Sequence, residues 1–149
     1  MLFLSRSDLN SLGISPVEVM DCLEALILAQ RSGEVWAAPK SVVVTPDKRY
    51  MMSTLSAAND PSLMSVKSLV LNQANTEKGL PAINSLITLL DSVTGVPMAI
   101  MDGNWVTAIR TACASAVAAR RMANPDSSVI AFIGCGVQAH SHLDAYAPL

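Results

Sequence analysis

The sequence predicts an α/β protein with two parts. The first part is an α+β domain with a mainly antiparallel sheet, and the second is the first strand and helix start of a doubly wound sheet. Three observations predict this: a strongly signalled helix precedes several β-branched segments, an alanine-rich helix follows them, and a short apolar strand then enters a glycine turn. We expect the boundary in the alanine-rich helix, which gives domains 1–122 and 123–149.

The composition excludes several classes of protein. The 149 residues carry a net charge of −2, and 51% are hydrophobic and 15% charged. Disordered chains have the opposite balance, and a nucleic-acid partner needs a basic excess, so neither is expected. The longest stretch without Asp, Glu, Lys or Arg, Ser127 to Leu143, is too short and too polar to span a membrane. Three scattered cysteines form no disulfide or metal pattern, which predicts a reducing, cytoplasmic location.

The N-terminal elements begin with a short strand at Leu2–Leu4 and a helical turn at Ser7–Leu12. A longer helix over Pro16–Arg31 follows. Ser15 and Glu18 form a capping box around a proline at the first helical position, and apolar residues recur at helical spacing. This is the helix that local signals predict most directly.

The middle of the chain alternates between strand and turn patterns. Turn chemistry at 45–48 and a hairpin loop at 91–95 join neighbouring strands, while residues 57–61 and 72–81 are expected to be loops. Both faces of the resulting sheet look apolar, so we expect both to be covered. The five expected strands are Ser41–Thr45, Tyr50–Leu55, Ser65–Leu71, Ile83–Leu90 and Pro97–Met101.

The last part of the chain carries the pattern G-x-G-x-x-A at residues 134–139. A helix over Trp105–Met122, with alanines on one face, is followed by an apolar strand at Val129–Ile133 that enters this turn. In a dinucleotide site the first glycine permits the tight turn, the second lets a pyrophosphate approach, and the helix N-terminus favours the anion. An ordinary strand-to-helix turn is the alternative. The acidic residue that binds the ribose should follow about 20 residues later, so we expect this chain to be the N-terminal portion of a longer protein.

A few polar residues stand in apolar surroundings. Lys67 lies inside a predicted strand, either at an exposed edge or in a pocket that lowers its pKa. Arg110 is near a helix start, where the helix dipole does not favour a cation. Lys40 is most simply a solvated flank. His140 and His142 do not share a helix face and lack a third ligand, so no metal site is expected.

Two stretches carry a resemblance to a known family. The segment 101–112, MDGNWVTAIRTA, and the segment 132–139, FIGCGVQA, resemble the ornithine cyclodeaminase/mu-crystallin family. Further matches are Val66-Lys67, Gly79-Leu80-Pro81 and the hairpin from Asp91 to Met98. The resemblance covers nearly the whole chain. Because family members are about twice as long, it implies a complete N-terminal substrate and dimerisation domain and only the opening of a Rossmann domain.

The resemblance implies an enzyme that uses NAD or NADP. Family chemistry is hydride transfer at the α-carbon of an amino or imino acid, and ornithine cyclodeamination yields proline and ammonia. Lys67 matches the active-site lysine, which binds the substrate carboxylate and handles protons, and Arg110 matches an arginine that meets carboxylate and cofactor. Lys40 occupies another carboxylate-binding position. The implied cofactor-binding residues are Ala82, Arg110, Gly134, Gly136, Val137 and Gln138, and the implied assembly is a homodimer through the N-terminal sheet.

Three residues depart from the family pattern. Lys40 stands where many members have arginine, and a lysine cannot hold a carboxylate in a bidentate fork. In this respect the chain is similar to the family's archaeal alanine dehydrogenases. Ala82 replaces a threonine that touches the cofactor, and Met52-Ser53 replaces Met-Pro. The family's catalytic aspartate would lie beyond Leu149.

The leading hypothesis is therefore an NAD(P)-dependent enzyme that converts a small α-amino acid, with ornithine to proline as the family's named reaction. An alanine-type dehydrogenase or a ketimine reductase is the first alternative. A non-catalytic binding or dimerisation module is the second. We expect the 149-residue chain alone to be inactive, because it holds only the pyrophosphate part of a cofactor site.

Overall fold

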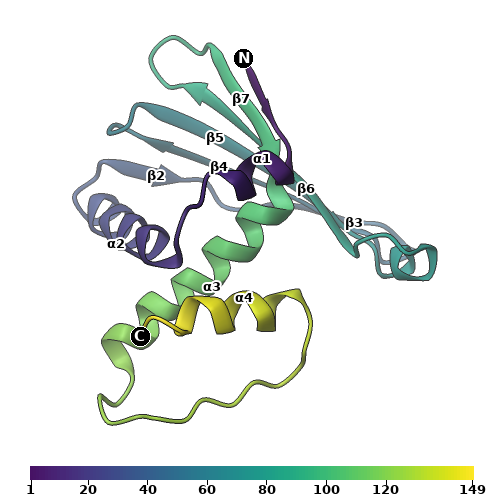
Figure 1. Ribbon diagram of the computed structural model, residues 1–149. Coiled ribbons are helices and arrows are strands. Elements are labelled where there is room, and N and C mark those ends of the chain that lie inside the picture. The colour runs from purple at the N-terminus through teal and green to yellow at the C-terminus, as the bar shows by residue number, and fades with distance from the viewer.

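The computed structural model describes residues 1–149 and contains one mixed sheet with helices on one side (Figure 1). The strands follow the order β1-β7-β6-β5-β4-β2, and β3 also pairs with β4. Only the pairing of β1 with β7 is parallel. The elements are β1 Leu2–Leu4, α1 Arg6–Ser11, α2 Pro16–Arg31, β2 Val35–Ala37, β3 Ser41–Val44, β4 Tyr50–Ala58, β5 Leu63–Leu71, the 3-10 helix η1 Gln73–Lys78, β6 Ile83–Asp91, β7 Pro97–Asp102, α3 Gly103–Met122 and α4 Val137–Tyr146.

The predicted mainly antiparallel sheet is confirmed, with more strands than expected. Both expected hairpins are present, β3 with β4 and β6 with β7. The short strand β2 had no sequence signal of its own; it pairs with the end of β4. That pairing carries β4 to Ala58, into the segment that we expected to be a loop. The expected loop at 72–81 contains η1.

Helices α2 and α3 begin where side chains accept hydrogen bonds from their first amides. Helix α2 has the predicted bounds, and the predicted capping box is formed by Ser15 and Glu18. Helix α3 begins two positions before the predicted start, because the Asp102 carboxylate accepts a hydrogen bond from the backbone amide of Trp105 at 2.7 Å. The sharp entry also depends on Gly103, since a Cβ there would lie 2.5 Å from the Ser85 hydroxyl of β6.

The buried core lies among the three larger helices rather than within the sheet. Its members are small, so the helices approach closely, as the alanine-rich face of α3 predicts. Met20 of α2 is the largest fully buried apolar side chain. The core residues are Met20, Ala112, Cys113, Ala116, Val117 and Ala145. No helix is long and apolar enough to cross a membrane.

The helices cover one face of the sheet and leave the other open. The covered face includes Ile87 and Ala99, which are buried, whereas Leu55 and Met64 on the opposite face are about half exposed. Residues that pair directly across antiparallel strands share a face, and the register assigns side chains from six strands to this open face. They include Trp36, Val43, Met51, Leu55, Met64, Leu86 and Ile100. The expectation that both faces are covered is therefore not met within this chain.

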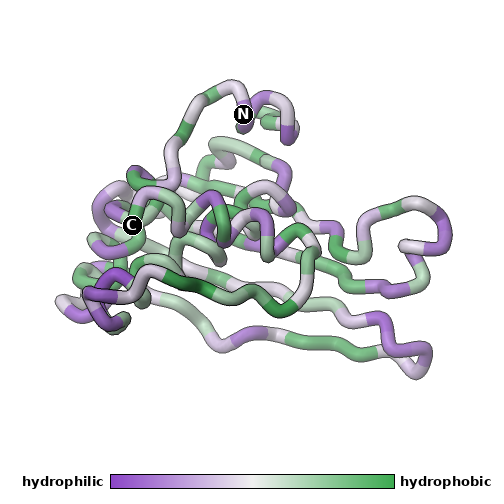
Figure 2. Tube along the Cα trace, turned by 60° about the horizontal axis from the view of Figure 1, so that its bottom comes forward, coloured by the Kyte–Doolittle hydropathy of each residue, from purple (hydrophilic) through white to green (hydrophobic).

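The predicted strand at Val129–Ile133 is wrong. These residues have no regular secondary structure, and none of their backbone groups pairs with another backbone group. Val129 and Ile133 are almost completely exposed. A parallel strand needs a neighbour to hydrogen-bond, and the sheet lies on the far side of α3 (Figure 1). The segment remains a hydrophobic connection leading into α4 (Figure 2).

Candidate active site

Lys67 lies in the middle of β5, between β4 and β6. It pairs with Thr54 on one side and with Ile87 on the other. Ile87 is buried beneath the helices, and α3 contacts both β5 and β6, so the Lys67 side chain stands on the covered face. This location rules out the interpretation of Lys67 as an edge-strand lysine.

Two further cations, Lys40 and Arg110, both exposed, are near enough to Lys67 for their charges to act on it. Burial lowers the pKa of the Lys67 ammonium, and the positive charges of Arg110 and Lys40 lower it further. Arg110 comes from the second turn of α3, and Lys40 immediately precedes β3. None of the three side chains takes part in an ion pair or donates a hydrogen bond. We call Lys40, Lys67 and Arg110 the cation cluster.

The cation cluster has a net positive charge that no acidic side chain of this chain neutralises. Converging like charges are unfavourable unless an anion joins them. A partly desolvated amine with a lowered pKa also exchanges protons closer to neutral pH than an ordinary lysine. The arrangement is therefore suited to hold a small carboxylate and to move a proton beside it.

The glycine turn has the conformation that its sequence pattern predicts. Gly134 has φ of +100°, which side-chain-bearing residues rarely adopt. Gly136 is the N-cap of α4 and provides no side-chain cap, and a Cβ at Gly136 would meet nothing within 4 Å. The first amides of α4 are thus free to meet an anion that approaches the turn.

A cavity of about 720 Å³ brings together three of the predicted cofactor-binding residues. Ala82, Val137 and Gln138 line it, and its other walls come from α1, α3 and the loop after α1. Thr107 also lines this cavity, and its hydroxyl is buried with no hydrogen-bond partner. The cavity does not include the cation cluster, Gly134 or Gly136. The structure therefore groups the predicted site residues into two sets, one on the sheet and one at α4.

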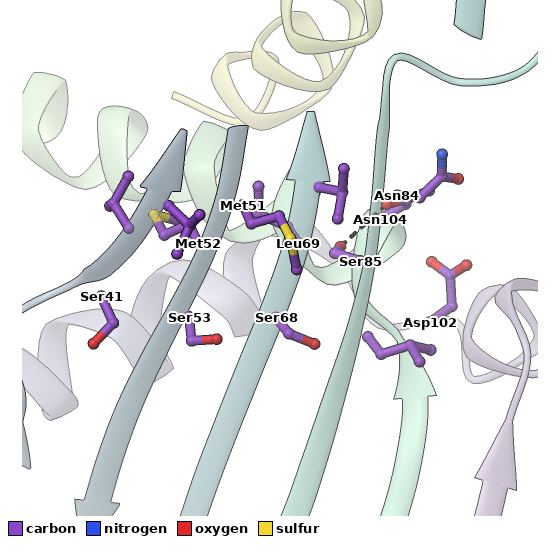
Figure 3. Close-up of a pocket in the computed structure, with 14 residues that line it drawn as sticks. Ser41, Met51, Met52, Ser53, Ser68, Leu69, Asn84, Ser85, Asp102 and Asn104 are labelled. Atoms are coloured by element: carbon purple, nitrogen blue, oxygen red, sulfur yellow. Dashed lines mark hydrogen bonds between the residues drawn. The ribbon is translucent and has the colours of Figure 1, made fainter. Parts of the chain in front are cut away.

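A second cavity, of about 630 Å³, opens mainly on the uncovered face of the sheet (Figure 3). Register aligns Ser41, Ser53 and Ser68 with Leu86 and Asp102 across five strands. None of the residues predicted to bind substrate or cofactor lines this cavity. Sequence analysis missed the serine row, although the alternation of side chains along each strand places each serine on that face.

The two histidines near the start of α4 behave differently. His140 is exposed, while His142 contacts α3, and no group of three metal-ligating side chains converges anywhere in the chain.

Comparisons with known proteins cover almost the whole chain. The model of the ornithine cyclodeaminase/mu-crystallin family matches residues 1–148. The solved structure of Thermococcus litoralis Δ1-pyrroline-2-carboxylate reductase, in complex with NADH and L-proline, superposes with a TM-score of 0.92 at 38% identity. That match covers 97% of this chain and 45% of the reductase.

A solved structure and a curated relative that are both named alanine dehydrogenase give similar results. An archaeal alanine dehydrogenase dimer with bound NAD has a TM-score of 0.92 at 30% identity, covering 99% of this chain and 45% of that one. Alanine dehydrogenase of Archaeoglobus fulgidus is 34% identical over 146 residues, which is 97% of this chain and 44% of that protein. The chain thus spans about 45% of the length of these relatives.

Proposed function

We propose that this chain, which belongs to the ornithine cyclodeaminase/mu-crystallin family, is the N-terminal part of an NAD(P)-dependent enzyme that acts on a small α-amino or α-imino acid. The observation that carries the proposal is the cation cluster: a half-buried lysine with a lowered pKa stands beside Arg110 and Lys40 with no acidic partner. Such a cluster is matched to a substrate carboxylate.

In this proposal Arg110 and Lys40 bind the carboxylate, and Lys67 handles a proton at the reacting nitrogen or carbon. Arg110 offers a planar fork for two carboxylate oxygens, whereas Lys40 contributes a single point charge. The lowered pKa of Lys67 makes its ammonium release a proton more readily than that of an ordinary lysine, which suits a residue that exchanges protons with the substrate. The sheet holds Lys67 rigidly, and α3 brings Arg110 to it.

The glycine turn and the start of α4 fit the pyrophosphate of a nicotinamide dinucleotide. Gly134 supplies the positive φ, Gly136 leaves open space, and Val137 and Gln138 border a cavity large enough for part of the cofactor. The bound nicotinamide supplies hydride transfer. Ala82 lies on the same cavity and offers only a methyl group at a position where the family has a hydroxyl.

We further propose an alanine-type or cyclic imino acid as the substrate, in preference to ornithine. Lys40 supports this choice, because the archaeal alanine dehydrogenases of the family are similar in having lysine there. Two reported relatives are named an alanine dehydrogenase and a pyrroline carboxylate reductase.

The test is a spectrophotometric assay of NADH and NADPH turnover by the full-length polypeptide with alanine, ornithine and cyclic imino acids. Lys67→Met should abolish turnover, and Lys48→Met, which changes an exposed lysine in the β3–β4 turn, should not. Dinucleotide binding without turnover of any substrate would instead favour a binding module.

We also propose that the chain forms a homodimer through the open face of the sheet. That face presents large apolar side chains from six strands and carries almost no charge. Exposed apolar surfaces of this kind mark protein–protein contacts. A second copy would cover the same residues on both protomers, as a two-fold interface requires.

A further inference from the structure

The contact between α4 and α3 has a polar part that no family motif assigns. The Nε2 atom of His142 lies 3.1 Å from the Ser115 hydroxyl of α3. The Nδ1 atom lies 2.6 Å from the carbonyl oxygen of Gln138, one turn earlier in α4. Tyr146, the last residue of α4, donates a hydrogen bond to the Ser115 carbonyl at 3.3 Å. Three side chains therefore join the two helices around Ser115.

The partners of His142 define its tautomer. A carbonyl oxygen only accepts, so Nδ1 carries the proton and donates to Gln138. In the neutral ring Nε2 is then the acceptor, and the Ser115 hydroxyl, which also lies 3.3 Å from the Thr111 carbonyl oxygen, donates to it. The ring is also stacked on Tyr146, with centroids 6.3 Å apart and planes inclined by 24°. The imidazole thus has fixed neighbours on both nitrogens and on one face.

The apolar part of the same helix contact is small. Ala145 is the only buried residue of α4, and it packs against alanines and Cys113 of α3. Burial of a methyl group stabilises far less than burial of a leucine or phenylalanine side chain. The connection over residues 123–136 contains no helix or strand that could hold α4 by itself. The polar contact, together with the edge-to-face packing of Phe132 on Tyr146, therefore carries a large share of the docking of α4.

We infer that the hydrogen bond between Ser115 and His142 fixes α4, and with it the glycine turn, on the helix that carries Arg110. His142 is then a positioning residue: it sets where the first amides of α4 lie relative to the cation cluster. The link to the cofactor rests on the proposed function, whereas the helix contact itself does not.

The test uses substitutions of His142 that keep a polar group at the position of only one of its two ring nitrogens. Glutamine places its amide near the position of Nε2, whereas asparagine reaches only the position of Nδ1. His142→Gln should therefore keep the contact with Ser115, and His142→Asn should lose it, as should Ser115→Ala. His140→Gln is the matched control, because His140 is exposed on the same helix and makes no side-chain hydrogen bond.

The first measurement is amide hydrogen exchange of α4 in the 149-residue chain. Loss of one hydrogen bond should speed exchange over Val137–Tyr146 about fivefold in His142→Asn and Ser115→Ala. His142→Gln and His140→Gln should exchange like the wild type. Equal exchange in all variants, or equal loss in His142→Gln and His142→Asn, would overturn the inference.

The second measurement is dinucleotide affinity of the full-length polypeptide, which should fall in the same two variants and in neither of the others. If exchange follows the expected order while the affinity of His142→Asn equals that of the wild type, the positioning role is refuted. If no variant binds a dinucleotide, wild type included, the proposed function fails, and the exchange result still decides the helix contact.

Discussion

A charge on the open face of the sheet should prevent self-association, and Leu55→Glu is the sharpest such change. Leu55 lies in β4 opposite Val66 and is 52% exposed, while Met51, Met64 and Leu86 around it are 50%, 46% and 56% exposed. Complete burial of a side chain of this size stabilises by about 1.5–3 kcal/mol. Covering the exposed half of one such side chain in the interface therefore contributes about 1 kcal/mol.

Every residue of a two-fold interface occurs twice, so the substitution removes about 2 kcal/mol per dimer before the charge is considered. That loss alone corresponds to roughly 30-fold weaker dimerisation. Burying an unpaired carboxylate adds a further cost of the same sign. We therefore expect Leu55→Glu to be monomeric at concentrations where the wild type is a dimer.

Sedimentation velocity at several concentrations measures this directly. Ile27→Glu is the control, since Ile27 is 56% exposed but lies on α2, away from the open face. Circular dichroism checks that both variants stay folded. A monomeric wild type at tens of micromolar, or a Leu55→Glu chain that dimerises as well as the wild type, would refute the reasoning.

Three further predictions concern the candidate active site. Arg110→Lys should raise KM for the amino acid far more than it changes thermal stability, because the two-pronged geometry of the guanidinium is lost while the charge is kept. Steady-state kinetics on the full-length polypeptide tests this, and an unchanged KM for every substrate contradicts it. Arg110→Gln should raise the pKa of Lys67, since a nearby positive charge is removed, so acylation of Lys67 near pH 8 should slow, while Arg49→Gln leaves it unchanged. Calorimetric titration of the 149-residue chain should show no tight binding of NAD or NADP, and micromolar binding at one site per chain would show that most of the site precedes residue 150.

The helices and hairpins were predictable because their signals are local. Ser15 and Glu18 satisfy the first amides of α2 whatever surrounds them, and the turn residues at 45–48 and 91–95 reverse the chain within a few positions. Strand β2 lacks such a signal, since its three residues form a strand only by pairing with the distant end of β4. Length and partner of a strand are properties of the sheet, not of the segment.

The segment Val129–Ile133 has the signal of a strand but does not form one, which is the reverse of β2. Its apolar, β-branched composition predicts a buried strand, yet it pairs with neither edge of the sheet in this chain. The composition of a segment indicates that its side chains would be stable in a core. The topology of the fold decides whether a neighbouring strand or helix is there to cover them. A strand pattern is therefore a conditional prediction, fulfilled only when neighbouring strands are present.

In the candidate site, too, the local features were predictable from the sequence and the contacts between distant segments were not. The pattern of glycines predicted the positive φ at Gly134, because that requirement is local. Lys67 and Arg110 stood out as polar residues in apolar segments, but only the family resemblance joined them in one site. No spacing rule relates a strand residue to a helix residue so far along the chain. The contact between Ser115 and His142 was missed for the same reason: it depends on how two helices pack.

Helix α3 connects these separate features. Arg110, near its start, is near enough to Lys67 for its charge to lower the pKa of that lysine, while Ala112 and Ala116, two and six residues later, are fully buried in the core that α3 shares with α2 and α4. The small side chains let α4 approach closely, and Ser115, next to Ala116, anchors it through His142. Arg110, which we propose to bind the substrate carboxylate, and Ser115, which supports the glycine turn, thus lie on the same helix. Relative movement of the two halves of the candidate site therefore requires either bending α3 or breaking the contact between α3 and α4.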